Sequence, residues 1–199
     1  IDGATGADFL AAVQKVLGVL TLDSEFADPA LRGKIYDKIS PVMSSPFADD
    51  LTRSACLDVM IHLQPNFARL HLFSMFYQES NGAFAVREAS RLSSGEAPLI
   101  PISDLLSLIK SGMKYDLADF SLNDGDSLRQ KYIRTGMLNK AAFMASTGLS
   151  EGREYIEELL ACRDYHLQAS LLALLGDMES RAIQSITVIG DYHNRLGRI

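Results

Sequence analysis

The stretch FARLHLFSMFYQESNGAFAVREASRL, residues 67–92, decides how the rest of the chain is interpreted. Two runs rich in aromatic and aliphatic residues flank Asn81-Gly82, and both of these residues tolerate the positive φ of tight hairpin turns. Alternate side chains of a strand share a face. One face of the first run is aliphatic, with Ala68, Leu70, Leu72 and Phe76. The other is mixed, with Arg69, His71, Phe73 and Met75. The stretch therefore predicts a β-hairpin with a core on one side and a more specific surface on the other.

Composition and charge exclude several classes of protein. The chain has 199 residues, and 47% of them are hydrophobic, which is typical of a globular domain. Its net charge of −6 and the absence of a Lys/Arg cluster argue against a nucleic-acid-binding surface. No signal peptide or long apolar run is recognisable. Two distant cysteines, Cys56 and Cys162, form no metal motif and are interpreted as small buried hydrophobes. We expect a cytoplasmic protein without contact to a membrane.

The remaining elements alternate between helical and strand-like patterns. Apolar residues at helical spacing predict helices over residues 7–22, 28–40, 48–63, 104–110, 127–134 and 165–196. Short β-rich runs predict strands over residues 97–102, 115–120, 138–146 and 153–162. Strands that are mostly neighbours in sequence, framed by terminal helices, predict an α/β chain of the α+β type with an antiparallel sheet.

The predicted C-terminal helix carries an approximate heptad pattern. Its a/d-like positions include Leu171, Leu175, Met178, Ala182 and Ile189. This spacing is typical of a helix that pairs with a second copy of itself. A single amphipathic helix packed on its own domain fits the same residues, and both interpretations stay open.

The order of these elements from Ser54 to Ile186 resembles a GAF domain, the small-molecule-sensing module of many bacterial regulators. The hairpin stretch resembles the first two strands of that family. Residues 99–121, LIPISDLLSLIKSGMKYDLADFS, are similar to the family's passage of short helix, Ser-Gly, strand and Asp. Residues 127–145, SLRQKYIRTGMLNKAAFMA, resemble the helix, glycine and strand that follow. In the matching positions stand Ser111, Gly112, Asp119 and Gly136.

The resemblance implies both an architecture and a role. The architecture is an antiparallel sheet of about five to six strands flanked by N- and C-terminal helices. Residues 47–187 would form the sensory domain, residues 1–46 an N-terminal helical extension, and residues 188–199 the continuation of a signalling helix. The role is that of a sensor in a bacterial signalling or transcription regulator. It would bind an unidentified small molecule and relay occupancy through its terminal helices to an output domain, as a homodimer.

The candidate ligand-binding residues lie on the mixed face of the hairpin and on the segments that follow. They are Arg69, His71, Phe73, Met75, Arg87, Asp119, Tyr132 and Phe143. Arginine forks hold carboxylates or phosphates, a neutral imidazole is a good ligand, and aromatic side chains line apolar pockets. In the family the matching Asp often caps a turn through its carboxylate, and this structural role is favoured for Asp119 over ligand contact. For each residue, a solvated surface position or a plain core position is the competing interpretation.

Catalysis is not predicted. No nucleophile elbow, phosphate loop or paired metal motif is present, and no metal or particular cofactor is expected. Asn139-Lys140 with Phe143 resembles part of a cyclic-nucleotide signature, but its acidic residues are missing. Two alternatives to the sensor remain: a ligand-free dimerisation module, and a small α/β enzyme using His71 or Cys162.

Overall fold

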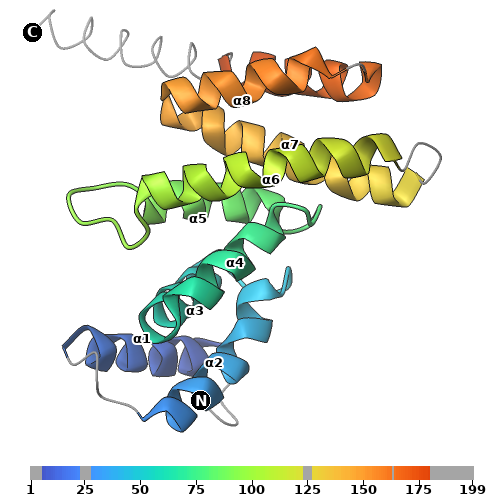
Figure 1. Cartoon of the computed structure of the whole chain (residues 1–199). Coiled ribbons are helices and arrows are strands. Elements are labelled where there is room, and N and C mark those ends of the chain that lie inside the picture. The colour runs from blue at the N-terminus through green and yellow to red at the C-terminus, as the bar shows by residue number, and fades with distance from the viewer. Residues whose placement is uncertain (1–5, 23–27, 123–126, 163, 180–199) are drawn as a thin grey trace, which may run out of the picture.

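The computed structural model describes residues 6–22, 28–122, 127–162 and 164–179, and within these ranges the regular elements are helices, without a strand (Figure 1). The helices are α1 (Ala7–Leu22), α2 (Pro29–Ser44), α3 (Asp50–Leu63), α4 (Pro65–Met75), α5 (Gly82–Leu92), α6 (Ile102–Leu122), α7 (Ser127–Thr147) and α8 (Ser150–Ala161). A further helical segment covers 165–179. The predicted α/β fold with a GAF-like antiparallel sheet is therefore wrong.

The stretch predicted as a hairpin forms α4 and α5. The burial of its side chains shows why a helix was taken for an alternating strand pattern. Ala68, Leu72 and Phe76 are completely buried, and their spacing of four fits a helix as well as it fits every second residue of a strand. Two other residues distinguish the patterns. Met75, on the supposed mixed face, is completely buried, whereas Leu70, on the supposed aliphatic face, is 56% exposed. Only the helical period is consistent with both.

The Asn81-Gly82 pair joins two helices and makes no hairpin turn. Asn81 has a φ of −114° and Gly82 is the first residue of α5. The glycine is needed for close packing, because a Cβ there would lie 2.0 Å from Nδ2 of Asn139 on α7. The Asn81 side chain is buried and donates to the Ser44 carbonyl at 2.9 Å.

The other predicted strands are also wrong. Residues 115–120, 138–146 and 153–162 lie in α6, in α7 and largely in α8, and residues 97–102 form an irregular connection up to the start of α6. Gly112 and Gly136 do not end helices, and α2 continues through Pro41. At Gly136 the reason is contact, since a Cβ would lie 2.2 Å from the Tyr77 ring. A glycine that permits a close helix crossing looks like a helix stop in sequence.

The N-terminal helices were predicted more closely. The expected helix over 7–22 coincides with α1. Asp28 caps α2 by accepting a hydrogen bond from the Leu31 amide at 2.9 Å, and Asp49 caps α3 in the same way from Thr52. α3 ends before Pro65, as predicted, but Pro65 itself begins α4.

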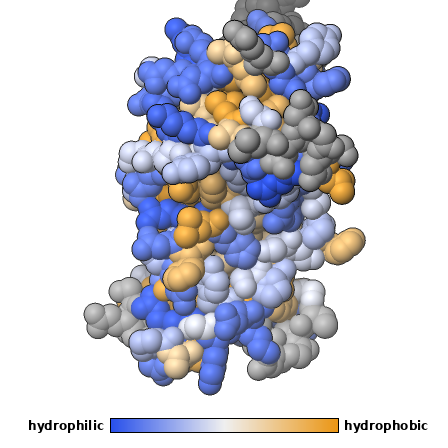
Figure 2. Space-filling view, turned by 45° about the vertical axis from the view of Figure 1, so that its right-hand side comes forward, coloured by the Kyte–Doolittle hydropathy of each residue, from blue (hydrophilic) through white to orange (hydrophobic). Residues whose placement is uncertain are grey.

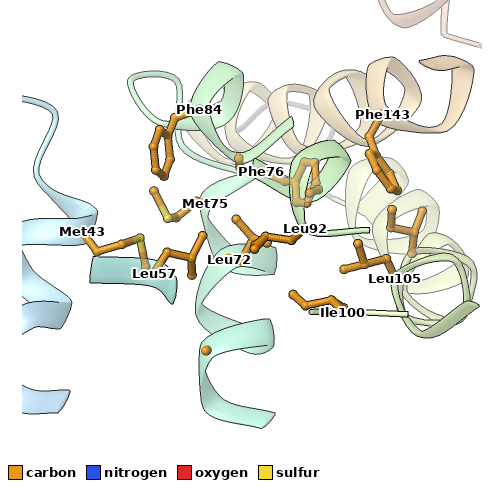
Figure 3. Close-up of a cluster of buried hydrophobic side chains, with 14 of the residues drawn as sticks. Met43, Leu57, Leu72, Met75, Phe76, Phe84, Leu92, Ile100, Leu105 and Phe143 are labelled. Carbon is orange, nitrogen blue, oxygen red and sulfur yellow. The ribbon is translucent and has the colours of Figure 1, made fainter. Parts of the chain in front are cut away.

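The helices are stacked in layers along one long axis (Figure 1). α1 and α2 pack on α3, α4 follows, and α5, α6 and α8 all pack on α7. Buried apolar side chains continue through the layers: Figure 3 shows Met43 and Leu57 on one side, Leu105 and Phe143 on the other, and Phe76 between them. Because each layer packs mainly on its neighbours, the stack exposes long outer faces, as helical repeat proteins do. Among the described helices, none has the length and hydrophobicity to cross a membrane.

Candidate functional site

The eight residues predicted to line a ligand pocket do not share one cavity. Arg69 lies on the outside of α4 and pairs with Asp104 of α6. Arg87 pairs with Asp50 at the surface between α5 and α3. His71 contacts Ser44 of α2, with 2.6 Å between Nε2 and Oγ. The pocket role of these three side chains depended on a strand face, and a helix turns them in different directions.

Two further residues of the predicted set, Asp119 and Met75, have contacts that stabilise the fold. Asp119 accepts hydrogen bonds from the Arg129 guanidinium, across the ends of α6 and α7. Met75 is a fully buried core residue. Neither lines one of the grooves formed by the described residues.

Three of the predicted residues do converge, around the end of α4. Phe73 meets the rings of Phe76 and Tyr77 edge-on, with centroids 6.1 and 5.9 Å apart. Tyr132 stacks on Tyr77 at 5.2 Å, and Phe143 lies 6.3 Å from Phe76. The aromatic character was recognised in the sequence, but two of these rings, Phe73 and Tyr77, lie beside a buried charge.

That charge belongs to Lys140, and the group it forms with Asp116 and Tyr77 is called the buried triad below. Lys140 is completely buried on α7, and its Nζ donates to Oδ2 of Asp116 on α6 at 2.5 Å. The Tyr77 hydroxyl donates to the other carboxylate oxygen at 2.7 Å and also contacts Nζ. Nζ lies 4.0 and 4.6 Å from the ring centroids of Tyr77 and Phe73. The triad thus joins α6, α7 and the end of α4.

Burial dominates the electrostatics of the triad. Desolvation lowers the pKa of Lys140, and the neighbouring carboxylate of Asp116 opposes that effect. Desolvation and the hydrogen bond to Asp116 raise the pKa of Tyr77 well above 10. No solvent-exposed atom of Lys140 is available to a substrate. The arrangement can hold helices in one register, but it offers no access for chemistry.

Tyr155 of α8 lies close to this group and has an unusual hydroxyl. The residue is completely buried, and its hydroxyl has no hydrogen-bond partner among the described protein atoms. Desolvation raises its pKa, and the charge of Asp116 adds to the effect. α8 can come this close because Gly152 lies against α7, where a Cβ would be 2.3 Å from the Met144 carbonyl oxygen.

These surroundings predict late ionisation of Tyr77 and Tyr155 in an alkaline titration. Both folded-state pKa values are raised above 10, so the folded protein keeps protons that the unfolded chain loses, and stability falls as pH rises above 10. Lys140 acts in the opposite sense, since its lowered pKa makes stability increase as pH approaches 10.5. We expect Tyr77 and Tyr155 to ionise only when helical circular dichroism is lost. In the Tyr155→Phe variant, Tyr77 should remain as a late-ionising tyrosine. Reversible ionisation of Tyr77 and Tyr155 before unfolding would contradict this prediction.

A second feature lies on the outside of α4 and α6 and is called the α4–α6 face. It consists of Phe67 and Leu70 of α4 and of Leu108, Ser111 and Tyr115 of α6. Phe67 is 65% exposed, Leu70 56% and Tyr115 79%. The spacing of three and seven residues puts Leu108, Ser111 and Tyr115 on one stripe of α6. On the side of the molecule in Figure 2, apolar side chains reach the surface as a band across several layers.

A groove separates the two helices of this face. It has a volume of about 440 Å³ and is lined by Asn66, Arg69, Leu70, Asp104, Ser107, Leu108 and Ser111. A second depression, of about 780 Å³, continues on the far side of Ser107 and Ser111 towards α8. Arg69 and Asp104 form an ion pair across the groove, and Arg69 also donates to Asn66 at 2.5 Å. Within the described residues, no group of His, Cys, Asp and Glu is arranged to hold a metal ion.

The predicted dimer seam is divided between the core and regions outside the described residues. Leu171 is completely buried in the core of its own chain, and Leu175 packs against that core. Met178 is half-buried. Ala182 and Ile189 lie outside the described residues. The first half of the segment therefore packs on its own domain, which was one of the two interpretations of its pattern.

The buried triad was missed because α6 and α7 were not recognised as long helices. On α6, Asp116 continues the apolar stripe of Ile109, Met113 and Phe120. On α7, Lys140 continues the stripe of Ile133, Met137 and Met144. A charged residue at an apolar stripe position of each helix is a recognisable signal for a buried pair, provided that the helical period is seen first.

No protein-family model matches this chain, and the searches of curated proteins and of solved structures found no significantly similar protein.

Proposed function

We propose that this chain is a protein-interaction module of stacked helices that pairs with a second copy of itself through the α4–α6 face. The observation that carries the proposal is the exposure of Leu70 on the wall of an open groove, with Phe67 also exposed one turn earlier on α4. Large apolar side chains that gather on an outer face, rimmed by polar groups, are characteristic of interaction sites.

Charge complementarity favours a second copy as the occupant. A two-fold dimer presents the same patch on both partners, so the patch must be complementary to itself. The groove holds one cation, Arg69, and one anion, Asp104, and therefore satisfies this requirement. The small side chains of Ser107 and Ser111 leave room for a helix to approach α6 closely, because side-chain size at the contact sets the distance between helix axes.

Self-pairing is expected to be lost when a charge is placed on this face. Phe67→Glu and Leu70→Glu remove apolar area and bury a carboxylate in the pair, which should weaken association by at least about thirtyfold, since truncating a central contact costs about 2 kcal/mol or more. Light scattering over a range of concentrations should give twice the 21.8 kDa chain mass for the unaltered protein and a single mass for each variant.

Phe47→Glu supplies the matched control, because Phe47 is 97% exposed and lies in the connection between α2 and α3, outside the two helices that form this face. That variant should pair as the unaltered protein does. A monomer at all concentrations, or equal loss in all three variants, would reject pairing through α4 and α6.

Binding is favoured over catalysis by the closed surroundings of the most unusual ionisable groups. Lys140 is completely buried, and the thiol of Cys56, whose pKa burial raises to about 12, is also inaccessible. The expectation of a ligand-responsive regulator stays a prediction. It depended on a sheet-bound pocket, and the described residues form helices.

A further inference from the structure

We infer that the Arg69–Asp104 ion pair determines the specificity of pairing, by exchanging partners between two copies of the chain. The inference rests on the proposed pairing through the α4–α6 face. Within one chain the pair spans the groove, and the side chains of Arg69 and Asp104 remain 28% and 42% exposed. Each group therefore has a free side that can meet a second chain.

The geometry of the groove limits how the two copies meet. Leu70 lies on the α4 wall and Leu108 on the α6 wall, with the ion pair across the groove between the helices. A two-fold axis that runs along the groove places α4 of one copy over α6 of the other. Each arginine then faces the aspartate of the second chain. The apolar contact supplies affinity, and the charges select this register, since like charges brought together at an interface cost several kcal/mol.

The exchange can be tested with two variants that are each unable to pair with themselves. Arg69→Glu leaves a face with acidic groups alone, and Asp104→Lys leaves one with basic groups alone. Each variant should self-associate at least about tenfold more weakly than the unaltered chain. An equimolar mixture should form a one-to-one pair, because an acidic face then meets a basic one. Native mass spectrometry separates the mixed pair from either homodimer when one variant carries a mass label.

A charge-matched control uses the ion pair of Lys131 with Glu79, whose Nζ and Oε2 atoms are 2.7 Å apart on α7 and the α4–α5 turn. Lys131→Glu and Glu79→Lys change the net charge equally and should each pair like the unaltered chain. Circular dichroism verifies that all four variants keep their helices.

The outcomes separate this inference from the proposed function. Mixed pairs from variants that fail alone support the exchange. If the unaltered chain pairs but the two groove variants pair equally well alone, or never pair in the mixture, the exchange is wrong while the function stands. If the unaltered chain is monomeric, both are rejected.

Discussion

Replacement of Lys140 by methionine is expected to lower the free energy of unfolding by about 3–5 kcal/mol, the usual cost of removing one partner of a buried ion pair. The substitution keeps most of the side-chain volume, so the loss comes from Asp116, which stays in the interior without its cation. The Tyr77 hydroxyl, which donates at 2.7 Å, is then the remaining hydrogen-bond donor that the structure places on that carboxylate. Chemical denaturation followed by circular dichroism measures the change.

Two controls distinguish the buried charge from a general effect of losing a lysine. Lys110→Met removes a lysine that is 39% exposed and pairs with Glu154, and it should cost far less, because solvent screens surface ion pairs. The double variant Lys140→Met, Asp116→Leu should be more stable than Lys140→Met alone, because no unpaired charge remains buried. Equal decreases in the free energy of unfolding for Lys140→Met and Lys110→Met would show that the buried triad contributes no more to stability than a surface ion pair.

Replacement of Arg53 by methionine has the second-largest expected effect, about 3 kcal/mol. Arg53 is 3% exposed on α3, and its guanidinium donates to the Met43 carbonyl at 3.0 Å and to Oδ1 of Asn81 at 2.7 Å. It also lies 3.7 Å from the centroid of Phe84 on α5. Hydrogen bonds to charged groups contribute about 1.5–3 kcal/mol, and a desolvated cation–π contact about 2 kcal/mol.

Arg87→Met is the matched control for Arg53. Arg87 also pairs with Asp50, but its side chain is 56% exposed. Surface pairs of this kind contribute about 0–1 kcal/mol. The two variants should therefore differ in the midpoint of urea denaturation by far more than the precision of the measurement. Similar midpoints would mean that the Arg53 contacts do not join α3 to α5.

The N-terminal helices could be predicted from sequence, and the central ones could not, for identifiable reasons. α1, α2 and α3 have apolar stripes, and Asp28 and Asp49 cap the last two. In α4 the residues Ala68, Leu72 and Phe76 fit two periods at once. Two glycines in close contacts, Gly82 of α5 and Gly136 of α7, resemble a hairpin turn and a helix stop in sequence. Their true role depends on side chains distant in sequence, which no local pattern contains.

Assigning these helical segments to strands also led to errors in the predicted site. Phe73, Met75, Tyr132 and Phe143 were expected to line an apolar pocket; Met75 lies in the core, and the three rings gather around the end of α4. The charge beside Phe73 was missed, because Lys140 and Asp116 fall on the apolar stripes of helices that had been divided into strands. A strand assignment also put Leu70 into the core, although it is 56% exposed and belongs to the surface proposed for pairing.

Hydroxyl-radical footprinting, read out by mass spectrometry at low and high protein concentration, tests whether two copies of the chain pair through the α4–α6 face. It reports solvent contact at individual side chains. Phe67 and Tyr115 are 65% and 79% exposed in the single chain, and Phe47 is 97% exposed. We expect oxidation of Phe67 and of Tyr115 to decrease as pairs form. Oxidation of Phe47 should stay constant. Unchanged oxidation of Phe67 in a sample whose mass has doubled would contradict pairing through α4 and α6.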